Sequence, residues 1–331
     1  MTQLIQEVKM EQQTNNINAT DSQNQPAVYD FLTYPRQFVT YKWYKPILVA
    51  LLTAVISMAF SLVLLAIGRV WSGDPGFIQA VQGGYDTINF ADGPYVLVMQ
   101  GGLASVLIAL ALAAIIVKDR PFSSYASSRG GWNWSAFLKC LGLCLPVYVV
   151  LGILSYVLSP PETIQWRFTL SGLILTLLLT PLQCVAEEFL FRGFLSQTIG
   201  AWTKKPVIGI VISAIIFMTA HPYNIFGAVE IFFCGLILGF LSWKTQGIEA
   251  TGAIHVLNNM MSFLMAGMGL ASIKAEVDMT SALLDIAAYV AAAALVIFVA
   301  DKKFGWFTAL GDDVVAYNTR MAEKQREKAT K

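Results

Sequence analysis

Residues 46–68 read PILVALLTAVISMAFSLVLLAIG and contain no charged side chain. A helix needs about 20 predominantly apolar residues to cross the hydrocarbon core of a bilayer, so this stretch is long enough to span it. Similar apolar segments follow along the chain, at about residues 95–117, 136–158, 168–190, 206–221, 224–243, 249–270 and 281–300. The sequence therefore predicts an all-α, polytopic membrane protein built as a bundle of about eight transmembrane helices.

The composition of the 331-residue chain agrees with this fold class. Hydrophobic residues make up 56% of it and charged residues 13%, and this charged share is about half that of a soluble domain. The 22 basic and 21 acidic residues nearly cancel, so the chain lacks the basic footprint of a nucleic-acid-binding protein. The cysteines lie in apolar runs without metal-site spacing, and we expect them to be small buried side chains: Cys140, Cys144, Cys184 and Cys234.

Charge patterning predicts the orientation in the membrane. Lys and Arg occur at 36–45 and 118–129, again at 204–205 and at 302–303, whereas the loop 71–94 contains acids and neither Lys nor Arg. Basic residues thus concentrate in every second loop. The positive-inside rule then predicts a multi-pass protein of the cell membrane with both termini cytoplasmic.

The flanks of the bundle are polar. Residues 1–34 are rich in Gln and Asn and lack the apolar region of a signal peptide. We therefore expect residues 1–44 to form a disordered cytoplasmic N-terminal tail. The transmembrane domain is expected at residues 45–303, and a charged cytoplasmic tail at residues 304–331.

Charged groups stand out in the fourth apolar segment. Glu188 and Arg192 are an i, i+4 pair on one helical face, while Glu187 points about 100° away from Glu188. Arg192 can therefore neutralise Glu188 and leave Glu187 available as a base. Intramembrane charges are costly and usually mark function, although a salt bridge that only locks the bundle remains an alternative.

The only two histidines, His221 and His255, also lie in apolar sequence. His255 and Asn259 are an i, i+4 pair, and both can donate hydrogen bonds to a carbonyl or an oxyanion. Alternatively, His221 is an interfacial or capping residue, and His255 with Asn259 is an interhelical hydrogen-bond pair.

Helix geometry predicts that these groups meet. Glu187 and His221 are equally far in sequence from Lys204, on the order of 20 Å into the membrane if the chain turns there. His255 and Asn259 lie about 12 and 18 Å beyond a turn at Gly247. We therefore expect them to converge around a water-filled cavity.

The chemistry that these groups fit is peptide-bond hydrolysis. Glu187, assisted by His221, would deprotonate a water, and His255 and Asn259 would stabilise the oxyanion of the tetrahedral intermediate. This reaction requires no cofactor and no metal.

Three short motifs, in order along the chain, resemble those of the CPBP family, which comprises CAAX prenyl proteases and bacteriocin-processing or self-immunity membrane proteins: Glu187-Glu188-x-x-x-Arg192, Phe217-x-x-x-His221 and His255-x-x-x-Asn259. The resemblance covers about residues 166–265, the expected catalytic core. It implies eight transmembrane helices and a glutamate-dependent intramembrane endopeptidase acting on a membrane-embedded or lipidated protein or peptide.

The resemblance also implies a role for each motif residue. Glu187 is the general base and His221 is the motif-two histidine. His255 and Asn259 form the oxyanion hole, and Glu188 and Arg192 are the supporting pair.

Two alternatives remain open at this point. His221, His255 and a glutamate have the chemistry to bind zinc and leave a water position, although their spacing is not HExxH. The chain is otherwise a non-proteolytic membrane immunity or scaffold protein of the same family. A transporter is less favoured, because no inverted repeat is visible.

Overall fold

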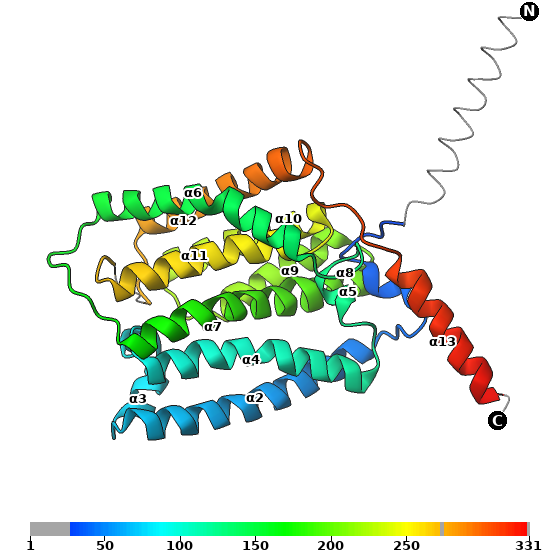
Figure 1. Ribbon diagram of the computed structural model, residues 1–331, viewed down its shortest axis with the longest axis horizontal. Helices are drawn as coiled ribbons and strands as arrows, with labels where there is room; N and C mark the ends of the chain where they lie inside the picture. Colours follow the sequence, from blue (N-terminus) through cyan, green and yellow to red (C-terminus); the bar gives the residue numbers. More distant parts are fainter. Residues whose placement is uncertain (1–26, 272–274, 330–331) are drawn as a thin grey trace, which may run out of the picture.

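The structure is a computed structural model that describes residues 27–271 and 275–329. All of the predicted apolar segments form helices, which lie side by side in a bundle (Figure 1): α2 (Lys45–Ser72), α4 (Gly93–Val117), α6 (Trp134–Leu158), α7 (Leu170–Glu188), α9 (Pro206–Thr219), α10 (Ile225–Thr245), α11 (Glu249–Gly267) and α12 (Met279–Leu295). Short helices connect or extend them: η1 (Tyr34–Gln37), α3 (Phe77–Gln82), η2 (Gly84–Asp86), α5 (Ser123–Ala126) and η4 (Val296–Asp301). The chain is an all-helical polytopic membrane protein.

Within the described residues, 6 helices are long and apolar enough to cross a membrane. The predicted number was about eight. The two that fall short are α9, which has only 14 residues, and α11. The N-terminal half of α11 is buried among other helices and carries Glu249 and His255, so it does not present an apolar surface to lipid. His255 lies within α11, and His221 follows shortly after the end of α9.

The fourth segment is one continuous helical rod. α7 passes directly into the π-helical segment η3 (Phe189–Ser196) and then α8 (Gln197–Thr203), so the helix runs past residue 200. The π-helical turns begin immediately after Glu188. Wider turns of this kind are frequent at functional sites, and they change the register of the side chains that follow.

α7 and α11 lie next to each other in the middle of the bundle. α4 packs between α2 and α7, and α11 contacts both α6 and α7, while α10 lies against α9 and α12. The largest hydrophobic cluster joins α6, α10, α11 and α12. All four cysteines are buried and free, as predicted. This packing places the acids of α7 opposite the histidine of α11.

Residues 27–44 differ from the expected disordered tail. Phe31 and Leu32 are fully buried in a cluster with residues of α4 and η3, because the backbone carbonyl of Leu32 lies directly against Gly200 of α8. The packed structure therefore begins before residue 45. The part of the predicted tail formed by residues 1–26 lies outside the described residues.

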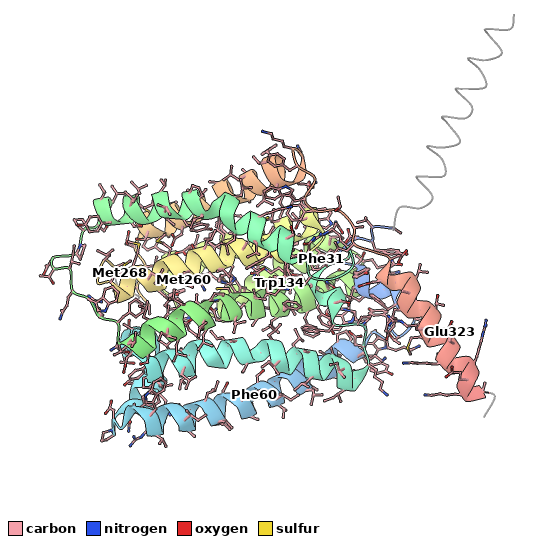
Figure 2. The ribbon with its side chains drawn as sticks, viewed as in Figure 1. Phe31, Phe60, Trp134, Met260, Met268 and Glu323 are labelled. Carbon is pink, nitrogen blue, oxygen red and sulfur yellow. The ribbon has the colours of Figure 1, made fainter. Side chains whose placement is uncertain are left out.

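The charged C-terminal segment forms the helix α13 (Asp313–Ala329). Its Val314 packs against Tyr34 and Phe38. Figure 2 shows Glu323 on the part of this helix that extends away from the bundle. The described N- and C-terminal segments lie at the same end of the bundle (Figure 1), which is the arrangement that an even number of crossings produces.

Gly193 provides a test of the contact between η3 and α5. A Cβ at this position would collide with the backbone carbonyl oxygen of Tyr125. We expect Gly193→Ala to lower the free energy of unfolding by about 1–3 kcal/mol, as overpacking does. Gly142→Ala is the matched control, because a Cβ there has open space and alanine favours the helix. Thermal denaturation in detergent measures both, and equal stability of the two variants contradicts this packing.

Candidate active site

A buried ion pair anchors the site. The Arg192 guanidinium donates a 2.9 Å hydrogen bond from NH1 to Glu188 Oε1, and both side chains are almost fully buried. The predicted i, i+4 pairing is therefore present. Phe217 of α9 lies over the guanidinium, whose central carbon is 4.6 Å from the ring centroid. α7 and η3 thus carry the pair, and α9 covers it.

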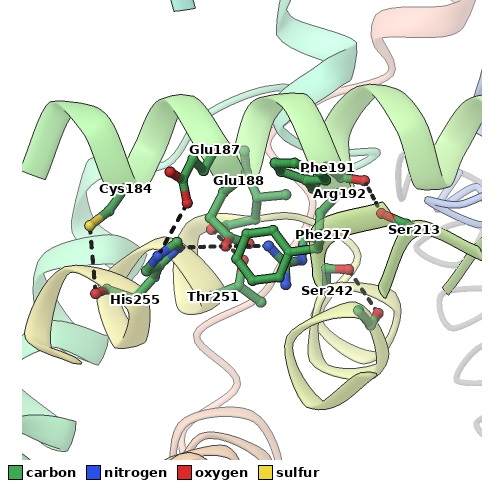
Figure 3. Close-up of polar contacts among 12 residues, drawn as sticks. Cys184, Glu187, Glu188, Phe191, Arg192, Ser213, Phe217, Ser242, Thr251 and His255 are labelled. Atoms are coloured by element: carbon green, nitrogen blue, oxygen red, sulfur yellow. Dashed lines mark hydrogen bonds and ion pairs between the residues drawn. The ribbon is translucent and has the colours of Figure 1, made fainter. Parts of the chain in front are cut away.

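His255 joins α11 to the same carboxylate. Its Nδ1 lies 2.9 Å from Glu188 Oε1 (Figure 3). A carboxylate paired with an arginine accepts hydrogen bonds, so Nδ1 carries the proton. The other ring nitrogen, Nε2, then holds a lone pair when the ring is neutral and an N–H when it is charged. Glu188 therefore sets the orientation of His255, as carboxylates commonly do for functional histidines.

Glu187 faces the other side of His255. Its Oε1 accepts a 2.6 Å hydrogen bond from Gln183 Nε2. Its Oε2 lies 3.6 Å from His255 Nε2, which is too long for a hydrogen bond. No described residue donates a hydrogen bond to Oε2. One oxygen of Glu187 is therefore held in place, and the other has no hydrogen-bond partner among the described residues.

Asn259 lies beside His255, as the i, i+4 spacing predicts. Its Nδ2 is 3.3 Å from His255 Nε2 and 3.4 Å from Gln183 Oε1. These bonds are longer than the usual distance of about 2.9–3.0 Å. An N–H group held this weakly can turn to a stronger acceptor at low cost.

His221 follows the C-terminal end of α9. Its Nδ1 lies 2.8 Å from the Phe217 backbone carbonyl oxygen, which only accepts, so Nδ1 donates. Its Nε2 then holds the lone pair of the neutral ring. The ion pairs of the described residues link Glu187 to His255 and not to His221. The expected assistance of Glu187 by His221 is therefore not a direct contact here.

Phe217 packs at the centre of the three motifs. Its ring centroid is 4.7 Å from that of His221 and 6.2 Å from that of His255. Because it also covers Arg192, it separates the supporting ion pair from His221. This explains in physical terms why an aromatic residue stands four positions before that histidine.

A cavity of about 1030 Å³ connects these side chains. All four predicted catalytic residues line it, and so does Gln183 of α7. The four are Glu187, His221, His255 and Asn259. Glu187 and His221 therefore face the same space, which is large enough for bridging waters. The cavity that the sequence analysis required is present.

Gln183 is the polar contact that the sequence analysis missed. It donates to Glu187 and accepts from Asn259, and so links the acid to the amide. Its position four residues before Glu187 was the available signal, because that spacing puts both side chains on one helical face. Glu230 of α10 and Asp285 of α12 also line the cavity and were not singled out.

The described residues contain no group of three or more His, Cys, Asp or Glu side chains placed to hold a metal ion. Of the residues considered as zinc ligands, His255 contacts the two glutamates, whereas His221 forms no ion pair with either. The arrangement does not resemble a three-ligand zinc site.

The residues of this site lie in a region that matches a known protein family. The model of the family "Type II CAAX prenyl endopeptidase Rce1-like" matches residues 168–261. The chain carries an Rce1-like region. This confirms the resemblance to the CPBP family, and the matched residues contain all three motifs.

The chain is also similar to a curated protein. The "Uncharacterized protein YyaK" of Bacillus subtilis (strain 168) is 27% identical over 160 residues, which are 45% of this chain and 54% of that protein. The chain thus matches about half the length of this relative. No solved structure matches the chain.

The buried ion pair predicts a large effect of removing Arg192. Arg192→Met would leave Glu188 buried with only His255 to compensate it, and we expect the free energy of unfolding to fall by about 3–5 kcal/mol. Arg320→Met on α13 is the control, because Arg320 is exposed and such substitutions usually change stability by about 0.5 kcal/mol or less. Denaturation in detergent distinguishes them. A small effect at Arg192 would show that Glu188 does not need this counter-ion.

Proposed function

We propose that the protein is an intramembrane endopeptidase that hydrolyses a peptide bond of a membrane-associated protein or peptide. The observation that carries the proposal is the state of Glu187. One of its oxygens is held by Gln183, and the other accepts no hydrogen bond from the described residues beside a cavity. A carboxylate positioned in this way is suited to take a proton from a water.

In the proposed reaction, the activated water attacks the carbonyl carbon of the scissile bond. Its proton passes to Glu187, and the carbonyl oxygen becomes the oxyanion. His221 holds the water through its unprotonated Nε2, which the bond from Nδ1 to Phe217 leaves available. The proton then moves from Glu187 to the leaving amine as the C–N bond breaks.

His255 and Asn259 are proposed to stabilise the oxyanion. Asn259 turns an N–H from its long bonds to His255 and Gln183. His255 donates from Nε2 when its ring is charged, and the hydrogen bond from Nδ1 to Glu188 holds the ring in place. Preorganised donors of this kind typically contribute about 2.7–4 kcal/mol each to the transition state.

The substrate is proposed to be a lipidated or membrane-embedded polypeptide, because the matched family is described as a CAAX prenyl endopeptidase.

The loop charges support a location in the cell membrane with both termini cytoplasmic. The described N- and C-terminal segments lie at one end of the bundle (Figure 1), in agreement with this topology.

Replacing the proposed base and its partner tests the mechanism. We expect Glu187→Ala and His221→Ala to reduce cleavage of a peptide library in detergent by at least about 10²-fold each, because water is no longer deprotonated or oriented. Glu323→Gln on α13 is the control and should cleave like the wild type, because Glu323 is exposed. Thermal denaturation checks that each variant is folded.

Unchanged cleavage by folded Glu187→Ala would rule out the glutamate mechanism. If the wild type cleaves nothing, and a variant without the motifs still complements the cellular phenotype, the immunity or scaffold alternative is favoured instead.

Chelation separates the glutamate mechanism from the zinc alternative. We expect active purified protein to keep its activity after treatment with a strong chelator, because the proposed step uses Glu187 and His221 without a Lewis acid. Elemental analysis of the same sample accompanies the assay. Near-stoichiometric zinc, with activity lost on chelation and restored by zinc, would favour the metalloprotease.

A further inference from the structure

Gln100 of α4 lies outside the three motifs and outside the matched family region, yet it lines the same cavity. It is only 2% exposed. Its amide oxygen Oε1 accepts a 2.5 Å hydrogen bond from the hydroxyl of Thr180 on α7. A hydroxyl on a neighbouring helix therefore fixes the orientation of a buried glutamine amide at the wall of the cavity.

The other end of this amide is unpaired. No described residue accepts a hydrogen bond from Gln100 Nε2, and the atom is shielded from bulk solvent. Burying a donor without a partner is unfavourable. Among the described residues that have such an unpaired buried atom, Gln100 and Glu187 are the ones that line this cavity. A ligand oxygen in the cavity would supply the missing partner.

The position of Thr180 relates Gln100 to the proposed base. Thr180, Gln183 and Glu187 lie three and then four residues apart, and so share one face of α7. At a rise of about 1.5 Å per residue, Thr180 is about 10 Å from Glu187 along the helix axis. An extended peptide advances about 3.3 Å per residue. A substrate that lies along α7 would therefore pass Gln100 about three residues from the bond that is cleaved.

We propose that Gln100 is a substrate-binding residue whose Nε2 donates to a main-chain oxygen about three residues from the scissile bond, and that Thr180 positions its amide. The oxygen is either a peptide carbonyl or a C-terminal carboxylate, which present the same acceptor chemistry. The placement of the substrate along α7 and the position of the scissile bond rest on the proposed function, whereas the binding contact itself does not require cleavage.

Binding measurements test the contact directly. The probe is a fluorescent, S-farnesylated peptide that ends in a Cys-a-a-X sequence, and its Kd is measured by anisotropy in detergent in the non-cleaving Glu187→Gln background. We expect Gln100→Leu and Thr180→Val to weaken binding by about tenfold and about threefold, respectively, because one hydrogen bond is lost or misoriented. Gln79→Leu, at an exposed site on α3, is the control and should bind like the parent.

Modified probes identify the oxygen. Single peptide carbonyls are replaced by methylene groups, and the terminal carboxylate is replaced by an amide. We expect one of these changes, about three residues from the scissile bond, to weaken binding of the probe to the parent about tenfold. The same change should not alter the binding of the probe to Gln100→Leu. If amidation has this effect, the acceptor is the terminal carboxylate, and if a methylene replacement has it, the acceptor is a peptide carbonyl.

Gln100→Glu guards against misfolding, because it keeps the size of the side chain and replaces the donor with an acceptor. It should weaken binding at least as much as Gln100→Leu. Parent-like binding of every probe by folded Gln100→Leu or Gln100→Glu would overturn the inference, even if the wild type is a protease. Conversely, loss of binding in these variants of a wild type that cleaves nothing would overturn the proposed function and keep the contact.

Discussion

The carboxylate of Glu188 is the interaction on which the site depends. It receives Arg192 from the following helical turn and His255 from α11, so a single buried group joins two helices that are far apart in sequence. A buried carboxylate with two cationic or donor partners is stable only when both remain in place. The geometry of Glu187, one residue earlier, follows from it, because α7 cannot rotate without breaking this pair.

Around this anchor, the structure separates two kinds of polar group. Glu188 Oε1 accepts from Arg192 and from the Nδ1–H of His255, and the cavity lining does not include Glu188 or Arg192. Glu187 Oε2 and Gln100 Nε2 have no hydrogen-bond partner among the described residues, and both side chains belong to the cavity wall. A membrane interior penalises unpaired polar groups, so the presence of these two at the cavity wall supports a role in binding water and substrate.

Much of the fold and part of the site could be predicted from local sequence. The apolar segments became helices, and Glu188 with Arg192 and His255 with Asn259 are neighbours, because i, i+4 spacing on a helix determines proximity without tertiary information. The packing of Phe31 and Leu32 could not be predicted, since it depends on the missing side chain at Gly200 of α8. The full role of Gln183 could not be predicted either, because its spacing to Glu187 does not show that it also accepts from Asn259 of α11.

The sequence by itself determined the membrane class, the helical segments, the two i, i+4 pairs and the family resemblance, since each depends only on hydropathy, helical periodicity or motif order. Only the tertiary structure decided which partner each group has. It placed His255, rather than His221, next to Glu187 and gave Glu188 two donors. It also brought Gln100 to Thr180 from outside the motifs. The physical reason is that contacts between helices depend on how the helices are rotated and offset against one another, which packing sets and local spacing does not.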